Sequence, residues 1–275
     1  MRTYRSTHRP PRSSDPPVAG AVRKGPLLAI CLGYFLVILD VTVVNVAVPR
    51  IGAGLGAGQG ALQWIVDGYT LVFAGLLLLC GGLGDRLGHR RVFLAGLGLF
   101  TVASAACALA PTAGFLIGAR LAQGAGAATM VPASLALLGA LHPEPGARAR
   151  AFGVWGGIAG VAAAAGPVLG GVLVWGVGWR TVFLVNIPLG ALAIWLTVRH
   201  VPATRPRAER PSLDLAAQLT GVGAVAALTA GLNEAGGRGW TDPLVLGALA
   251  AAPLAGRCSC GWSGARRRPR CHRGC

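Results

Sequence analysis

The sequence is short of charged residues. Asp, Glu, Lys and Arg together make up 12% of its 275 residues, whereas hydrophobic residues make up 53%. A soluble domain normally carries about 25% charged residues. A soluble fold of this length would bury a large core and would need many more charges to cover it. The composition therefore excludes an ordinary soluble domain and favours a protein of the lipid bilayer.

Acidic residues are the scarcest charged class, with nine Asp and Glu against 25 Lys and Arg and a formal net charge of +16. Such an excess of basic residues could indicate a nucleic-acid-binding protein. Here, however, the basic residues lie in the tails and in short polar segments between apolar runs, and few aromatic residues accompany them. They do not share one folded face, so we expect no nucleic-acid partner.

Apolar runs long enough to cross a bilayer recur along the chain. A hydrocarbon core of about 30 Å needs roughly 20 apolar residues in a helix. Membrane strands are excluded, because an open sheet edge finds no hydrogen-bond partner in lipid and the runs are too long for barrel strands. The sequence therefore predicts an all-α membrane protein. The predicted helices are 26–48, 63–83, 92–110, 114–138, 151–174, 180–199 and 213–232, followed by a run at 243–255 that stops short.

The predicted helices divide the chain into five parts. The polar, Arg- and Pro-rich start lacks the features of a cleaved signal peptide. The five parts are a disordered cytoplasmic tail at 1–25, a six-helix transmembrane bundle at 26–199, a cytoplasmic linker at 200–212, helix seven with a partial eighth helix at 213–256, and a basic, Cys-rich, disordered tail at 257–275.

Charges in the connecting segments give the helices a direction. With the N-terminus in the cytoplasm, the inside segments hold fifteen Lys and Arg residues, and the outside segments hold three, which are Arg50, Arg180 and Arg238. Lys and Arg are enriched on the cytoplasmic side of membrane proteins. We therefore predict a multi-pass protein of the plasma membrane with a cytoplasmic N-terminus.

Ionisable residues inside apolar runs each cost roughly 2.5–3.5 kcal/mol on insertion scales, and two of them stand out. Asp40 is more than halfway along the first run, and burial favours the neutral form of a carboxyl group, so Asp40 could take up and release a proton. Alternatively, it is a structural partner for a neighbouring helix. Arg120, early in the fourth run, keeps its charge. It either faces the bundle interior, toward a carboxylate, or extends to the outer interface.

Two Gly-rich motifs follow the same pattern of helices. The segment GGLGDRLGHRR, residues 81–91, is predicted as a tight inside loop in which Asp85 caps the next helix or pairs with an arginine. In the fifth run, Gly156/Gly160 and Gly166/Gly170 are GxxxG pairs that allow close helix approach, and Pro167 should bend the helix. This helix is either a moving part or a static packing seam.

Together these motifs resemble the major facilitator superfamily, and specifically its fourteen-helix drug/proton antiporter branch. GGLGDRLGHRR resembles the signature between helices 2 and 3, LDVTVVNVAVP the helix 1 motif with Asp40 as its acid, and RLAQGAGAATMVPAS the helix 4 motif with Arg120 as its arginine. GPVLGG, residues 166–171, resembles the antiporter motif of helix 5. WRTVFLVNIPLGALAIWL, residues 179–196, is similar to the entry into helix 6.

The resemblance implies a secondary active transporter that exports small amphipathic compounds, such as drugs or antibiotics, in exchange for protons. Its partners would be the bilayer, protons and a small-molecule substrate. Asp40 and Arg120 would serve proton coupling or substrate binding. The sequence offers no nucleophile, metal cluster or phosphate-binding loop, so we predict neither an enzyme nor a cofactor or metal. The conformational motifs would comprise Gly81, Asp85, Arg86, Gly88 and Arg90 in the loop, and Gly166, Pro167, Gly170 and Gly171 in helix 5.

The sequence also departs from the family pattern. Ala162 replaces a glycine of the helix 5 motif, and His89 replaces a basic residue of the loop motif. The chain covers one bundle of the two that the family carries, so an inactive truncated fragment is one alternative, and a membrane enzyme or scaffold is another. Beyond Gly256 the sequence is rich in Arg and Cys, which fits translation in a shifted frame better than a zinc site.

Overall fold

The computed structural model describes residues 24–203 continuously, together with scattered positions between 220 and 250. The two predicted tails, the linker and the helices predicted at 213–232 and 243–255 lie wholly or largely outside the described residues. The helices of the described part are α1 (Lys24–Leu55), α2 (Gln59–Leu87), α3 (His89–Ala108), α4 (Ala113–Leu141), α5 (Pro145–Gly176), α6 (Thr181–Leu184) and α7 (Asn186–His200).

The predicted six-helix membrane bundle is confirmed. By length and composition, six helical stretches of the described part can cross a membrane, with α6 and α7 together forming the sixth. Helix α4 packs against α2 and α3, while α1 packs against α5 and α7. Large apolar side chains such as Phe93, Leu97 and Leu137 are fully buried between the helices. The polar residues of the bundle interior are therefore surrounded by buried apolar side chains.

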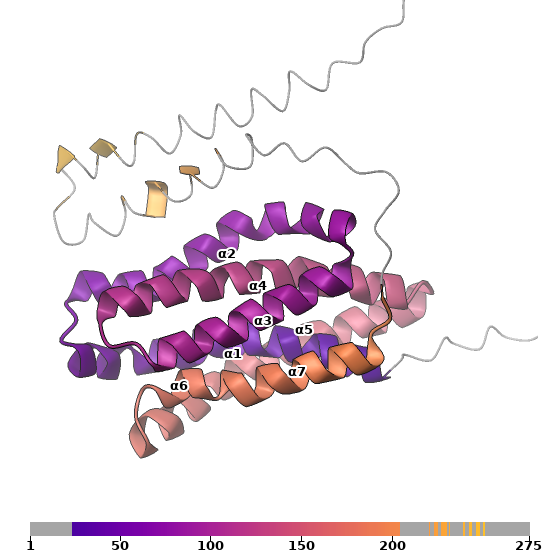
Figure 1. The fold of residues 1–275 in the computed structure, drawn as a ribbon, viewed down its shortest axis with the longest axis horizontal. Coiled ribbons are helices and arrows are strands. Elements are labelled where there is room, and N and C mark those ends of the chain that lie inside the picture. The colour runs from indigo at the N-terminus through magenta and orange to yellow at the C-terminus, as the bar shows by residue number, and fades with distance from the viewer. Residues whose placement is uncertain are drawn as a thin grey trace, which may run out of the picture.

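The connections alternate between the two ends of the bundle. The start of α1, the α2–α3 and α4–α5 connections and the end of α7 lie at one end, and the other connections lie at the opposite end (Figure 1). By the helix bounds, Lys24, Arg86, Arg90 and Arg199 belong to the first end, so basic segments that were predicted to share one side lie together.

The prediction that residues 81–91 form a loop is wrong. Helix α2 continues to Leu87 and α3 begins at His89, so Gly88 alone separates them. Gly88 has a φ of 91°, which a residue with a side chain rarely adopts, and its amide donates to the carbonyl of Gly84 at 2.9 Å. The turn therefore needs one glycine rather than a Gly-rich loop. Asp85 does not cap α3, because the N-cap residue is Gly88 and the helix start has no side-chain capping hydrogen bond.

The helical hydrogen bonding of the sixth crossing is interrupted at Val185, between α6 and α7, while the backbone there keeps α-helical angles (φ −62°, ψ −27°). Pro188 explains the break, because its ring conflicts with the carbonyl of residue 184, one turn earlier, and it has no amide hydrogen to donate to that carbonyl. Asn186 becomes the first residue of α7 and is completely buried. Asn186 thus places a polar side chain inside the bundle.

Candidate functional site

Asp40 lies at the centre of the bundle and is 1% exposed. Three side chains donate hydrogen bonds to its carboxylate. Arg120 Nη1 donates to Oδ2 at 2.5 Å, and Gln123 Nε2 and Asn186 Nδ2 each donate to Oδ1 at 2.8 Å. A buried carboxylate is tolerated when it is paired with a cation and fully hydrogen-bonded. The geometry therefore describes Asp40 in its charged form, with both oxygens occupied.

Arg120 also faces the interior and is 1% exposed, so its side chain does not extend to the membrane interface. Besides Asp40, its Nε donates to the backbone carbonyl of Ile65 at 3.1 Å, and Nη1 donates to Gln123 Oε1 at 2.8 Å. The guanidinium carbon lies 4.2 Å from the centre of the Tyr69 ring. An arginine above an aromatic face gains a cation–π interaction, which is stronger when both groups are desolvated.

Gln123 links the ion pair to α3. Its Nε2 donates to Ser104 Oγ at 2.9 Å as well as to Asp40, and its Oε1 accepts from Arg120 and, at 3.6 Å, from the thiol of Cys107. Ser104 in turn donates to the carbonyl of Phe100 at 2.7 Å. We call the group formed by Asp40, Ser104, Arg120, Gln123 and Asn186 the central network.

The central network draws its side chains from four helices, α1, α3, α4 and α7. Arg120 and Gln123 are three residues apart on α4, so they lie on one face of that helix and reach Asp40 together. The helices are held at this point by directional bonds rather than by apolar contact alone. A change in the charge of Asp40 would therefore be felt by three other helices at once.

Sequence reasoning found Asp40 and Arg120 but missed Gln123, Ser104 and Asn186. Amides and hydroxyls stand out less than charges within apolar runs, although an unpaired amide or hydroxyl is also costly in lipid. A usable signal was present, because Gln123 follows Arg120 by three residues and Asn186 stands two residues before Pro188.

The residues of the loop motif lie at the basic end of the bundle, away from the central network. His89 Nε2 lies 3.5 Å from Asp85 Oδ1. Gly84 leaves room for this contact, since a Cβ there would lie 2.3 Å from His89 Nδ1. Arg86 is in the last turn of α2, and a Cβ at Gly81 would meet nothing within 4 Å.

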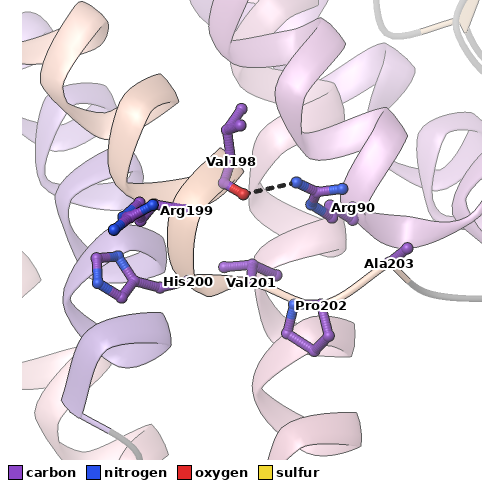
Figure 2. Close-up of a pocket in the computed structure, with 7 residues that line it drawn as sticks. All are labelled: Arg90, Val198, Arg199, His200, Val201, Pro202 and Ala203. Atoms are coloured by element: carbon purple, nitrogen blue, oxygen red, sulfur yellow. Dashed lines mark hydrogen bonds between the residues drawn. The ribbon is translucent and has the colours of Figure 1, made fainter.

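Arg90 ties the start of α3 to the end of α7, because its Nη2 donates to the carbonyl of Val198 at 2.9 Å. The bond borders a cavity of about 420 Å³ at the basic end of the bundle. Figure 2 shows the side chains of Arg90, Arg199 and His200 around it, with Pro202 and Ala203 beyond the helix end. This cavity is separate from the central network.

Two glycines of the helix 5 motif form a close seam with α1. A Cβ on Gly166 would lie 1.9 Å from Thr42 Oγ1, and one on Gly170 would lie 3.2 Å from Val46 Cβ. A Cβ on Gly171 would meet nothing within 4 Å, and the same holds for Gly156 and Gly160. Pro167 is exposed, and α5 continues across it. Of the two GxxxG pairs, Gly166/Gly170 therefore packs closely against another helix of the described part, whereas Gly156/Gly160 does not.

The described residues hold no group of three or more His, Cys, Asp or Glu side chains that could bind a metal ion. The polar groups of the central network are engaged with one another, apart from the side-chain oxygen of Asn186. The arrangement is therefore suited to holding one carboxylate whose charge controls a set of helix contacts.

Comparison with known proteins gives a consistent picture. A family model described as Major Facilitator Superfamily matches residues 30–270. A methylenomycin A resistance protein of Streptomyces coelicolor is 46% identical over 229 residues, which are 83% of this chain and 48% of that protein. Multidrug resistance protein Stp of Mycobacterium tuberculosis is 44% identical over 217 residues, 78% of this chain and 40% of that protein.

Among solved structures, a peptide transporter POT in complex with sulfate is similar with a TM-score of 0.61 and 18% sequence identity. The match covers 80% of this chain and 48% of the transporter, and at this identity it shows a shared fold. The chain spans about half the length of the curated relatives that it matches.

Proposed function

The chain belongs to the major facilitator superfamily, and from this premise we propose that it provides the first bundle of a secondary active exporter of small amphipathic compounds driven by inward proton flow. Relatives named for resistance to methylenomycin A and to multiple drugs support export of antibiotic-like substrates. The proposal assigns transport rather than catalysis to the chain.

The observation that carries the proposal is the fully buried carboxylate of Asp40 among three hydrogen-bond donors. A proton bound there removes the negative charge and weakens the charge-assisted bonds from Arg120, Gln123 and Asn186. A single protonation thereby loosens α1 from both α4 and α7. Such a step can couple proton uptake to a rearrangement of helices.

Arg120 is supported in a way that suits this cycle. When Asp40 is neutral, Arg120 retains the carbonyl of Ile65, the side-chain oxygen of Gln123 and the face of Tyr69. An arginine with no remaining partner in the core would cost several kcal/mol. The three remaining contacts lower this cost and allow Arg120 to stay in place as a fixed positive charge.

We propose that the basic end of the bundle is cytoplasmic, in keeping with the positive-inside rule. The Asp85–His89 contact and the bond from Arg90 to Val198 would then hold helix ends together on the inner side during alternating access. The close approach of Gly166 and Gly170 to α1 fits a moving α5, and it equally fits a static packing seam. Substrate would bind between this bundle and a second one.

Transport can be tested in vesicles that contain the purified chain and carry an imposed proton gradient. We expect gradient-dependent efflux of a fluorescent lipophilic cation, and loss of this efflux in Asp40→Asn. Asp67→Asn is the matched control, because Asp67 is a partly exposed α2 residue outside the central network. Equal efflux in Asp40→Asn and in the native chain would refute the proton role.

A second outcome of the same experiment concerns the length of the chain. The chain spans about half of its curated relatives, so an inactive fragment of an exporter is the alternative function. Vesicles that contain the folded chain and show no efflux under any gradient would favour this alternative. Circular dichroism of the same vesicles distinguishes a folded, inactive chain from an unfolded one.

A further inference from the structure

In the side-chain amide of Asn186, the nitrogen is hydrogen-bonded and the oxygen is not. Its Nδ2 donates to Asp40 Oδ1 at 2.8 Å and lies 3.5 Å from Ser104 Oγ. Its Oδ1 is buried and has no hydrogen-bond partner in the described part of the chain. Buried polar atoms are nearly always paired, so an unpaired carbonyl oxygen beside the key carboxylate needs an explanation.

A protonated Asp40 would require an acceptor that the charged form does not need. A carboxylate only accepts hydrogen bonds, whereas a carboxylic acid also donates one. Gln123 Oε1 already accepts from Arg120 and Cys107, and Ser104 Oγ accepts from Gln123. Within the central network, the unused acceptor is Asn186 Oδ1.

We infer that Asn186 is a positioning residue that serves both protonation states of Asp40 by rotating its amide. This inference rests on the proposed proton role of Asp40. In the charged state, Nδ2 donates to the carboxylate, as the structure shows. When a proton from the aqueous phase binds to Asp40 Oδ1, a half-turn about the Cβ–Cγ bond of Asn186 breaks the bonds from Nδ2 to Asp40 Oδ1 and to Ser104 Oγ. Oδ1 of the amide then accepts a hydrogen bond from the new O–H group.

The surroundings of Asn186 favour this role over that of a second structural residue. Asn186 is the first residue of α7, beside the break at Val185, and its side chain reaches from α7 to α1. Tyr69 also has a buried hydroxyl without a partner, but no hydrogen bond joins it to Asp40 in the described part. The amide of Asn186 already touches the carboxylate, so a rotation in place is enough.

The chain offers an unusually clean test, because it contains three asparagines, Asn45, Asn186 and Asn233. Labelling with [15N]asparagine therefore gives three side-chain amide signals, which are assigned by replacing Asn45 and Asn233 with alanine in turn. Asn45 is exposed on α1 and serves as the internal reference. The same detergent sample gives the infrared carboxyl band of Asp40, identified by its loss in Asp40→Asn.

On lowering the pH, we expect the Asn186 amide signal to shift over the pH range in which the Asp40 carboxyl band appears, while Asn45 stays fixed. A band that appears while the Asn186 signal stays fixed overturns the inference and leaves the proton role intact. If the band appears at no pH, the proton role fails and the inference fails with it.

Two variants sharpen the result. Asn186→Leu removes the acceptor, so the Asp40 carboxyl band should move to higher wavenumber, as expected for an O–H group without a partner. Asn186→Asp places two carboxyl groups together, and such pairs hold one proton to higher pH. A carboxyl band unchanged in both variants contradicts the inference. If the leucine variant does not fold, the native titration and the isosteric aspartate variant still decide.

Discussion

Replacing Gly166 with alanine tests whether the α1–α5 seam is packed as closely as the structure indicates. The added Cβ would lie 1.9 Å from Thr42 Oγ1 and 2.5 Å from Thr42 Cβ. Non-bonded carbon atoms prefer about 3.5–4.0 Å, so α1 and α5 must separate by roughly 1 Å to admit the methyl group. Overpacking of this kind costs about 1–3 kcal/mol.

The matched control is Gly171→Ala, five residues further along α5. A Cβ there meets nothing within 4 Å. Both substitutions gain the same helix propensity of about 1 kcal/mol, so the difference between the variants isolates the steric cost, about 1–3 kcal/mol. Unfolding of the purified chains in detergent, followed by circular dichroism, measures this difference.

A double variant identifies the cause. Thr42→Ala removes the nearest atom, Oγ1, but leaves Cβ in place, so it should recover part of the stability lost in Gly166→Ala. Equal stability of Gly166→Ala and Gly171→Ala would refute the close seam. A loss that Thr42→Ala does not reduce would place the strain elsewhere.

Three further outcomes follow from the described contacts. Arg120→Met should destabilise the chain by about 3–5 kcal/mol, because it strands the Asp40 carboxylate, and Asp40→Leu in the same chain should restore most of the loss, as measured by denaturant unfolding. Arg90→Ala should lower the free energy of unfolding by about 1 kcal/mol, because the lost bond to Val198 is solvent-exposed. The same change should increase amide hydrogen exchange in the last turn of α7, which that bond ties to α3, and unchanged exchange there argues against the bond. Cys107 is fully buried and should escape maleimide labelling in the folded chain but not in denaturant, as read by mass spectrometry; rapid labelling of the native chain would contradict its burial.

The crossings were the most predictable part of the fold. A run of about 20 apolar residues has few alternatives in a chain with so little charge, and the six runs between residues 26 and 199 all correspond to described helices. The helix ends were less predictable. Helix α1 continues past Pro49 to Leu55, and Ile51 in this extension is completely buried in the core.

The site was predictable in its charges and not in its neutral partners. Asp40 and Arg120 stood out because ionisable residues are rare within apolar runs. Their contact joins residues 80 positions apart, which no local pattern specifies. Asn186 is farther still, 146 positions from Asp40. The pairing of neutral amides with the carboxylate therefore required the three-dimensional structure.

The spacing of the central network has a consequence for the order in which the chain is made. Asp40 leaves the ribosome 80 residues before Arg120 and 146 before Asn186. At a synthesis rate of about 5–20 residues per second, roughly 4–16 s pass between the synthesis of Asp40 and that of Arg120. During that time α1 must stay in the bilayer with an uncompensated acid. Of the six spans in the described part, α1 has the highest mean hydropathy, and its apolar residues, each contributing about −0.3 to −0.6 kcal/mol on insertion, offset the acid until α4 arrives.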